Sequence, residues 1–421
     1  MGNLPPPRRS KRLLKRKTEN EDESPPQIEE KRRPPRKRKT AANHQQQQQQ
    51  DVPPILLNCG GRRDWSGLDD GPAGVIAELV LANDVADYLR FRAVCRPWRR
   101  CCADPRTRAV LEDSRLHPRR WIMLLEAESE NLGPAAGAAP HCSSRRRRRF
   151  LNVSTGQCIQ VDIPELRDHG VLRSATEGLL LLLLGKGALR LLNPLTRQVA
   201  ELPPFSGGLH FSPGCSQSNA GLVDGGSRIL LYVRGHDTLA LAKPGDERWM
   251  LVKITDVLMP TMSFAGRFYG VAADNSTIMV VDMDRTRGEE ENRPPRLVVA
   301  AKLATTIRQM TDTAHLVDNA GELMLVHRRM RRVRGADGEY NEHKRTYKVY
   351  RVNLATGKTT PAAARGRPIF LGFNRALSVS PQVFPSLSKN TVYPALGFDN
   401  MGRDQQTRAY HLRDGTTESC S

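Results

Sequence analysis

Two short glycine-containing segments come closest to phosphate-binding chemistry in this sequence. The segment 357–359 (Gly-Lys-Thr) matches the end of a P-loop, in which a glycine-rich turn and a lysine hold phosphate groups, but Val352 stands where the first glycine is required. Gly185 and Gly187 begin a dinucleotide-binding fingerprint whose third glycine is replaced by Arg190. Neither segment therefore predicts nucleotide binding.

Cysteine and histidine residues, which serve as metal ligands and as catalytic groups, are scattered along the chain. None of the eight cysteines forms a C-x-x-C pair, and no cysteine or histidine cluster has the spacing of a zinc site. The sequence also lacks G-x-S-x-G and H-E-x-x-H. We therefore predict a non-catalytic protein with no cofactor and no metal site. The alternative is a catalytic site assembled from residues distant in sequence, which spacing does not reveal.

One basic cluster has the composition of a nuclear localisation signal. Seven of the nine residues 31–39 are lysine or arginine, as in nuclear import signals. The seven are Lys31, Arg32, Arg33, Arg36, Lys37, Arg38 and Lys39. The cluster predicts a nuclear protein, with the cytoplasm as a second location. The alternative is a solvated tail that contacts nucleic acid weakly through phosphates.

Positive charge is concentrated in two segments. The net charge of the 421-residue chain is +20, of which residues 1–50 carry +8 (14 Lys/Arg against 6 Asp/Glu) and the run Arg145–Arg149 carries +5. A uniformly basic nucleic-acid-binding surface is therefore not predicted. Residues 1–62, which include six consecutive glutamines and no sustained apolar periodicity, are expected to be a disordered tail. We expect the arginine run to lie in a solvated loop.

Residues 63–108 have the pattern of three short helices. An apolar stripe runs from Val75 to Val80, as on one face of a helix. Asp84 is suited to the N-cap of a second helix, and Pro97 to the first turn of a third. A unit this small has a marginal core, and any apolar residues left over would form a docking surface for a partner.

From Trp121 onward the sequence changes to short apolar runs with a period of two. Roughly twenty such runs alternate with turn residues, and no convincing helix interrupts them. The run Leu179–Leu184 is expected to be a strand buried on both faces. A sheet with that many strands does not stay open, so we expect either closure or radial repetition.

Three hairpin turns of the form Asn-x-x-Thr-Gly/Arg indicate radial repetition. They begin at Asn152, Asn193 and Asn353, which are 41 and 160 residues apart. Propeller blades repeat at about 40–50 residues, and four strands per blade give about six blades. We therefore predict a mainly β chain in which residues 115–421 form a β-propeller, with Trp121 and Tyr410 on strands of one closing blade. The alternative is a pair of stacked sheets.

Two parts of the chain resemble a known family of plant proteins. The segment DWSGLDDGPAGVIAELVLANDVADYLRFRAVCRPWRRCCADPRT is similar to the F-box of grass F-box proteins, particularly through FRAVCRPWR. The pieces FLNVSTGQCIQVDIPEL, LLNPLTRQVAELPP and YKVYRVNLATGK look like the KIB-type β-propeller that those proteins carry. The resemblance spans residues 64–412, and its pieces occur in the family's order.

The resemblance implies a substrate-recognition subunit of a Skp-cullin-F-box E3 ubiquitin ligase. In this family the F-box binds the Skp-family adaptor, and through it a cullin, while the propeller holds a target protein. The adaptor-facing residues would be Leu68, Ile76, Leu79, Val94, Cys95 and Trp98. Asp69 departs from the proline that many F-boxes have after this leucine, and it is suited to cap the helix instead. We also expect Trp98 and Leu79 to hold the helical unit together.

The sequence leaves two other functions open. One is a nuclear nucleic-acid- or chromatin-associated protein that uses the basic tail, and the other is an F-box protein that acts outside a ligase. No membrane partner is predicted, because the longest apolar run, Leu179–Leu184, is far too short to span a bilayer. The identity of the target protein is not predictable, because propeller surfaces are built from variable loops.

Overall fold

The computed structural model divides the chain into two units, residues 1–63 and 64–421. It describes residues 65–419 except 125–145, 176, 186, 206–217, 234–235, 256–257, 273–275, 284–293, 309–311, 335–341, 373–374 and 395–407. All described residues belong to the second unit. The predicted disordered tail, the glutamine run and the nuclear localisation residues lie outside them.

Three α-helices begin the described part of the chain, as the sequence predicts. They are α1 (Asp70–Asn83), α2 (Val85–Val94) and α3 (Arg96–Arg100). Short 3-10 helices are η1 (Trp65–Gly67), η2 (Pro105–Thr107), η3 (Ser114–Leu116), η4 (Pro164–Arg167) and η5 (Asp224–Gly226). Asp84 caps α2 and Pro97 lies in the first turn of α3, which confirms both predicted positions. No helix of the described ranges is long and apolar enough to cross a membrane.

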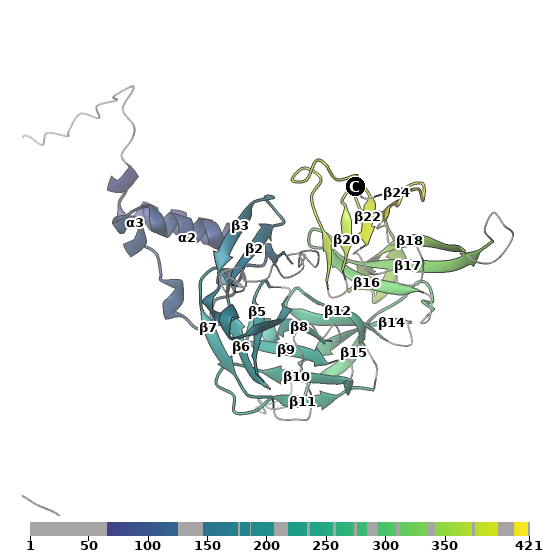
Figure 1. Ribbon diagram of the computed structural model, residues 1–421, viewed down its shortest axis with the longest axis horizontal. Coiled ribbons are helices and arrows are strands. Elements are labelled where there is room, and N and C mark those ends of the chain that lie inside the picture. Colours follow the sequence, from purple (N-terminus) through teal and green to yellow (C-terminus); the bar gives the residue numbers. More distant parts are fainter. Residues whose placement is uncertain are drawn as a thin grey trace, which may run out of the picture. The chain divides into compact units, whose positions relative to one another are not determined.

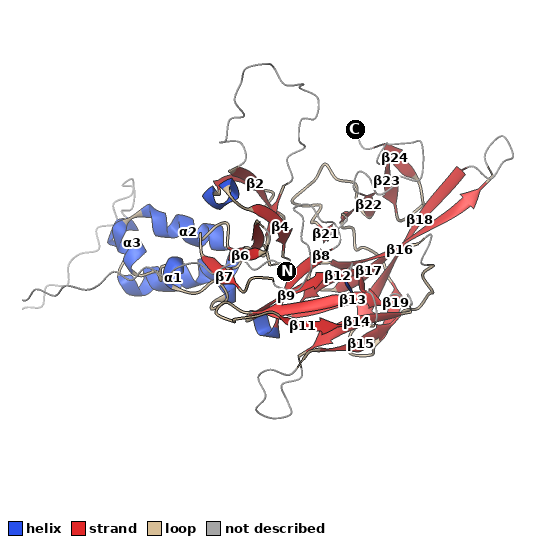
Figure 2. Cartoon of the chain, turned by 60° about the horizontal axis from the view of Figure 1, so that its bottom comes forward, coloured by secondary structure: helices blue, strands red, loops and turns tan. Residues whose placement is uncertain are grey.

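The rest of the described chain is β-structure in five sheets (Figures 1 and 2). The three-stranded sheet contains β1 (Trp121–Met123), β2 (Arg147–Asn152) and β3 (Cys158–Asp162). The two four-stranded sheets contain β4 (Gly170–Ser174), β5 (Leu180–Leu184), β6 (Ala188–Leu192) and β7 (Val199–Leu202), and β8 (Ser218–Val223), β9 (Arg228–Val233), β10 (Thr238–Ala242) and β11 (Met250–Lys253). The eight-stranded sheet contains β12 (Leu258–Phe264), β13 (Arg267–Ala272), β14 (Thr277–Asp282), β15 (Arg296–Lys302), β16 (Thr313–Asp318), β17 (Leu323–Val333), β18 (Glu342–Asn353) and β19 (Lys358–Pro361). The five-stranded sheet contains β20 (Ile369–Leu371), β21 (Ala376–Ser378), β22 (Thr391–Pro394), β23 (Arg408–His411) and β24 (Thr417–Ser419).

These strands form the blades of a propeller. The eight-stranded sheet consists of two antiparallel meanders, β12–β15 and β16–β19, which a single parallel bridge joins at Lys302 and Lys358. Four blades therefore have four strands each, and β1–β3 and β20–β24 form the first and last blades of the described chain. Consecutive blades adjoin through their first strands, since β4 contacts β8, β8 contacts β12 and β12 contacts β16. The predicted fold class, a mainly β chain with a propeller after a small helical unit, is confirmed.

The hydrophobic cores lie between neighbouring blades. One cluster joins Trp121 and Phe150 of the first blade to Leu180 and Leu182 of the second. Four further clusters fill the spaces between each later blade and the next. Every inner blade is thus covered on both faces, as radially repeated sheets require, and a simple pair of stacked sheets does not account for this packing.

The strand β5 shows how the sequence produces this packing. Successive side chains of a strand point to opposite faces, so Leu180 and Leu182 pack toward the first blade while Leu181 and Leu183 pack toward the third. All four are at most 3% exposed. Leu184 is 37% exposed, so the predicted burial of the leucine run on both faces is confirmed except at its last residue.

The three predicted turns have the same hydrogen bonds. In each, the asparagine side-chain oxygen accepts from the backbone amide two residues later, at 2.9 Å for Asn152, 3.1 Å for Asn193 and 3.0 Å for Asn353. The left-handed residue lies four positions after the asparagine, where Arg197 has φ of 67° and the other two turns have glycine. The equivalence of the turns is confirmed, and the glycine or arginine, not the asparagine, is left-handed.

The expected closing blade is wrong. We expected Tyr410 and Trp121 to lie in one blade, but β23 pairs with β22 and β24, whereas β1 pairs with β2. Contact between the first and last blades comes from a turn instead, because a Cβ atom on Gly156 would lie 3.4 Å from Val383 Cγ1. At Gly156 the two blades therefore meet through a turn and not through a shared strand.

The expectation that Arg145–Arg149 lie in a solvated loop is also wrong for most of these residues. Residues 147–149 begin strand β2, and they pair with residues 160–162 of β3 in the first blade. Their exposure alternates along the strand, so a polar outer face accommodates the charges while the backbone hydrogen bonds stabilise the strand. Arg145 itself lies outside the described residues.

Candidate adaptor-docking surface

The helix α1 buries two alanines and one leucine and exposes three other large apolar residues. Ala73, Ala77 and Leu81 follow one another at intervals of four, which places them on one face, and they are 1%, 1% and 5% exposed. Val75 and Leu79 lie on a different face and are 62% and 66% exposed. The helix therefore leaves on its surface the apolar area that would stabilise it most if a partner covered it.

Ile76 adds to this exposed face of α1. It adjoins Val75 in sequence, lies three residues before Leu79 and is 38% exposed. Trp65 on η1 and Val94 at the end of α2 are also exposed. We call these five residues, Trp65, Val75, Ile76, Leu79 and Val94, the exposed apolar set. Eleven large apolar residues of the described chain are exposed, so nearly half of them lie in this short helical unit.

Two aromatic side chains hold α2 and α3 together. The rings of Phe91 and Trp98 stack with centroids 4.4 Å apart and an interplanar angle of 17°. The Trp98 Nε1 donates a hydrogen bond to the Trp65 carbonyl oxygen at 3.1 Å. The Tyr88 hydroxyl donates to the Ala103 carbonyl oxygen at 2.8 Å, and burial raises the pKa of that hydroxyl. Trp98 is therefore part of the helical core while remaining half-buried.

The six predicted adaptor-facing residues divide into two groups. Ile76, Leu79 and Val94 are exposed, as such a role requires. The other three, Leu68, Cys95 and Trp98, are half-buried. The expectation that Leu79 holds the helical unit together is wrong, because its side chain is exposed and lies outside the core cluster.

Sequence reasoning did not assign Trp65 and Val75 to the surface. The four apolar residues from Val75 to Val80 occupy adjacent positions on the helix, so the period alone does not tell which of them faces inward. The buried alanines carried the signal, since Ala73 and Ala77 share a face with Leu81. No comparable signal marks Trp65, which precedes the helix.

The carboxylate of Asp84 joins the helical unit to the first blade. It caps α2 by accepting from the Ala86 backbone amide at 2.8 Å, and it also accepts from the Trp121 Nε1 at 3.1 Å and from the Asn152 Nδ2 at 2.9 Å. Asp84 is only 7% exposed. A buried carboxylate needs such donors, and three elements supply one each.

A second turn of the repeat makes an equivalent connection. The Asn193 Nδ2 donates to the Leu116 carbonyl oxygen at 2.8 Å. In the same turn, Leu195 packs against the helical core, which includes Leu116. Two of the three repeated turns thus use their asparagine side chains to hold segments that precede the propeller in sequence.

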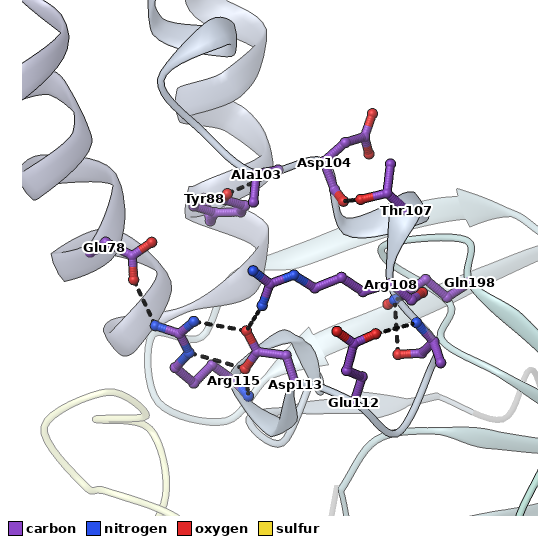
Figure 3. A network of polar contacts seen from close by, with 11 residues as sticks. Glu78, Tyr88, Ala103, Asp104, Thr107, Arg108, Glu112, Asp113, Arg115 and Gln198 are labelled. Carbon is purple, nitrogen blue, oxygen red and sulfur yellow. Dashed lines mark hydrogen bonds and ion pairs between the residues drawn. The ribbon is translucent and has the colours of Figure 1, made fainter.

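A polar network supports the segment that leads from the helices into the propeller (Figure 3). The Asp113 carboxylate accepts from Arg108 at 3.0 Å and from Arg115 at 2.8 Å, and Arg115 also reaches Glu78 of α1 at 2.6 Å. The Arg115 guanidinium holds the pKa of the Asp113 carboxyl below its usual value. The Gln198 Nε2 donates to the Arg108 carbonyl oxygen at 2.9 Å, which extends the network into the second blade.

No group of three or more His, Cys, Asp and Glu side chains in the described ranges is placed to hold a metal ion. Cys95, Cys101, Cys102 and Cys158 are free thiols. Burial raises the pKa of the Cys102 thiol to about 11, so it is protonated and unreactive near neutral pH.

The comparisons with solved structures show low similarity. Dihydro-heme d1 dehydrogenase NirN is 13% identical, with 51% of this chain and 44% of that chain covered and a TM-score of 0.25. A structural genomics protein of unknown function from Bacteroides thetaiotaomicron VPI-5482 is 8% identical, with 52% and 53% covered and a TM-score of 0.28. The tricorn protease is 12% identical, with 65% and 28% covered and a TM-score of 0.31. The chain spans about half or less of the length of these structures, and such matches carry no functional argument.

A comparison of the sequence with protein-family models gives a more specific result than the comparison of structures. No curated protein matches the chain. A family model described as KIB1-4 beta-propeller matches residues 150–413, which is more than half of the chain and covers β3 to β23 completely. Together with the blade order and the packing between blades, this match shows that the chain belongs to the KIB1-4 β-propeller family.

Proposed function

We propose that this protein is the substrate-recognition subunit of a Skp-cullin-F-box E3 ubiquitin ligase. The helical unit is an F-box that docks a Skp-family adaptor and through it a cullin, and the propeller binds a target protein. The observation that carries the proposal is the burial pattern of α1, in which Ala73 and Ala77 are buried while the larger Val75 and Leu79 are exposed. An isolated helical unit gains nothing from that arrangement, whereas one that binds a partner does.

The docking surface consists of the exposed apolar set. Covering an exposed Val or Leu side chain stabilises a complex by about 1–2 kcal/mol, so three such residues on α1 supply much of the energy that a micromolar complex needs. Trp98 and Leu68 act by shaping the surface from beneath, because they are half-buried in the helical core. Cys95 lies at the start of α3 and marks the edge of this surface.

The propeller contributes recognition and no chemistry in this proposal. A KIB1-4 propeller is a protein-interaction domain, and we propose that the chain lowers no chemical barrier itself. It raises the effective concentration of a bound target near the ubiquitin-loaded enzyme, which accelerates transfer without a catalytic residue in this chain.

Co-purification with a Skp-type adaptor tests the proposal. The double variant Val75→Gln, Leu79→Gln removes apolar area from α1 while keeping residues with good helix propensity. We expect it to lose at least about tenfold in adaptor affinity, as for central interface residues, with an unchanged melting temperature. The matched control is Val298→Gln, Val299→Gln, which changes two exposed valines of β15 and should bind normally.

The outcomes separate the competing functions. Adaptor binding by the α1 double variant at the level of the control would overturn the docking surface. Adaptor binding without recovery of a cullin would instead identify an F-box protein that acts outside a ligase. Failure of the wild-type chain to bind any Skp-type adaptor would reject the ligase proposal as a whole.

We also propose that the protein acts in the nucleus. The basis is the cluster of seven Lys and Arg residues within residues 31–39, which matches import signals. A fluorescent fusion of the full chain should accumulate in nuclei and should redistribute to the cytoplasm when the seven residues are changed to Ala. A wild-type fusion that is excluded from nuclei would reject this location.

A further inference from the structure

The hairpin of β17 and β18 extends beyond its blade as a two-stranded ribbon. These are the longest strands of the described chain, with 11 and 12 residues, and Figure 1 shows them reaching past β16. The neighbour β16 pairs with β17 only as far as Arg328, and β19 pairs with β18 only from Tyr350 onward. Residues 329–333 and 342–346 pair only with each other, and we call them the basic ribbon.

The basic ribbon and its flanks are strongly positive. From Arg328 to Lys348 the sequence contains eight Lys and Arg residues against three Asp and Glu, a net charge of +5. A quarter of the chain's net charge of +20 therefore lies on 21 residues. Arg332, Arg334, Lys344 and Lys348 are exposed.

Both faces of the ribbon carry positive side chains. Arg331 lies directly opposite Lys344 in the strand register, so the two side chains share one face, and Arg329 lies on that face two residues away. Arg332 and Arg345 lie on the other face by the alternation of side chains along each strand. A partner that contacted only one face would leave the positive charges of the other face without a negatively charged counterpart on that partner.

Positively charged residues face each other across the ribbon, as Arg331 and Lys344 do. Like charges directly opposite each other destabilise a strand pair, and a two-stranded ribbon has no sheet neighbours or core to offset that cost. Asp312 compensates in part, since its carboxylate accepts from Arg331 at 2.9 Å and from the buried His327 at 3.0 Å.

We propose that the basic ribbon binds the phosphate backbone of a nucleic-acid duplex by entering its major groove. The major groove of B-form DNA is about 12 Å wide and admits a two-stranded β-ribbon. The phosphates of the two DNA strands then flank the ribbon, where the long Lys and Arg side chains of both faces reach them. An acidic peptide would pair with one face or one edge only, so charge on both faces favours the duplex. This site is separate from the docking surface on α1 and does not depend on the proposed ligase role.

Fluorescence anisotropy with a labelled duplex of about 20 base pairs tests this site. The full chain is used with the seven basic residues of 31–39 changed to Ala, so that the tail does not contribute. On this background, Arg332→Gln, Lys344→Gln, Lys348→Gln removes three exposed charges of the hairpin. The matched control, Arg248→Gln, Lys253→Gln, Lys302→Gln, removes three exposed charges from β15, from β11 and from the segment before β11.

The ribbon variant should bind at least about tenfold more weakly, and its salt dependence between about 50 and 200 mM should fall by roughly 2–3 in the log–log slope. The control should retain the affinity and slope of its parent. Equal loss in the two variants would reduce the effect to overall charge and overturn the proposal. Tighter binding of polyglutamate than of the duplex would overturn it in favour of an acidic protein partner.

Discussion

A buried histidine on β16 makes the stability of the propeller sensitive to acid. His315 is 5% exposed and its ring nitrogen Nε2 lies 3.1 Å from the Thr313 hydroxyl. Burial lowers the pKa of His315 from 6.5 to about 3, and the positive charge of Arg328 acts in the same direction. The folded protein therefore holds this imidazole neutral at pH values where the unfolded chain protonates it.

The sign of the pH effect follows from these two pKa values. Between pH 6.5 and 3 the unfolded state binds more protons at His315, so the free energy of unfolding falls as the pH falls, by about 1.4 kcal/mol per pH unit. We expect His315→Asn to remove about 2 kcal/mol of the stability difference between pH 7 and pH 5, measured by urea unfolding at both pH values. The control His236→Asn changes an exposed histidine. A variant of His315 with the wild-type pH dependence would contradict the assignment.

Two aspartates at helix N-caps provide a matched comparison at the scale of single elements. Asp84 accepts three hydrogen bonds from three different elements, whereas Asp69, at the N-cap of α1, makes no side-chain cap bond. We expect Asp84→Ala to cost about 2–4 kcal/mol, because it removes a cap and leaves buried donors on Trp121 and Asn152 without an acceptor. Asp69→Ala should stay within about 0.5 kcal/mol of wild type. Thermal unfolding of both variants measures the difference, and equal costs would contradict the role of Asp84 as a joint.

The helices were predictable to the extent that their signals are local. Asp84 and Pro97 are found at the predicted cap and first turn, because capping depends on a few neighbouring residues. The inward face of α1 was not predictable from its largest residues, since Val75, Ile76 and Leu79 turn out to be exposed. Tertiary packing at α1 overrides the usual preference of large apolar residues for the core.

The strands were predictable for a similar reason, and their pairing was not. Leu180 to Leu183 form a fully buried strand as expected, because a short apolar run is typical of one. The asparagine turns are equivalent as expected. Their further role, in which Asn152 and Asn193 bond to segments before the propeller, depends on contacts across 68 and 77 residues, which no local pattern encodes. The wrong expectation that Trp121 and Tyr410 share a closing blade has the same cause, because strand pairing between distant segments is not encoded locally.

The assembly of the whole propeller depends on close approach between blades. Gly221 on β8 lies against the next blade, where an added Cβ atom would come within 2.1 Å of the Ser263 Oγ and 3.0 Å of the Phe268 ring. Because neighbouring sheets share one core, a clash there strains two blades at once. We expect Gly221→Ala to cost about 1–3 kcal/mol in a single cooperative transition measured by calorimetry. Gly67→Ala, with nothing within 4 Å of its added Cβ, is the control, and equal stability of the two would contradict tight packing at β8.

The hydrogen bonds of Asp84 to Trp121 and Asn152 also mean that the helical unit is synthesised before the residues that complete its packing. The helix α3 ends at Arg100. The helical core, however, also includes Leu195, and two of the hydrogen bonds to the Asp84 carboxylate come from Trp121 and Asn152. A ribosome that adds about 5–20 residues per second needs roughly 5–20 s to travel from Arg100 to Leu195. During that interval the nascent helices expose both their unfinished core and the apolar face of α1. The apolar face of α1 is therefore accessible on the growing chain well before the propeller residues that complete the helical core have been synthesised.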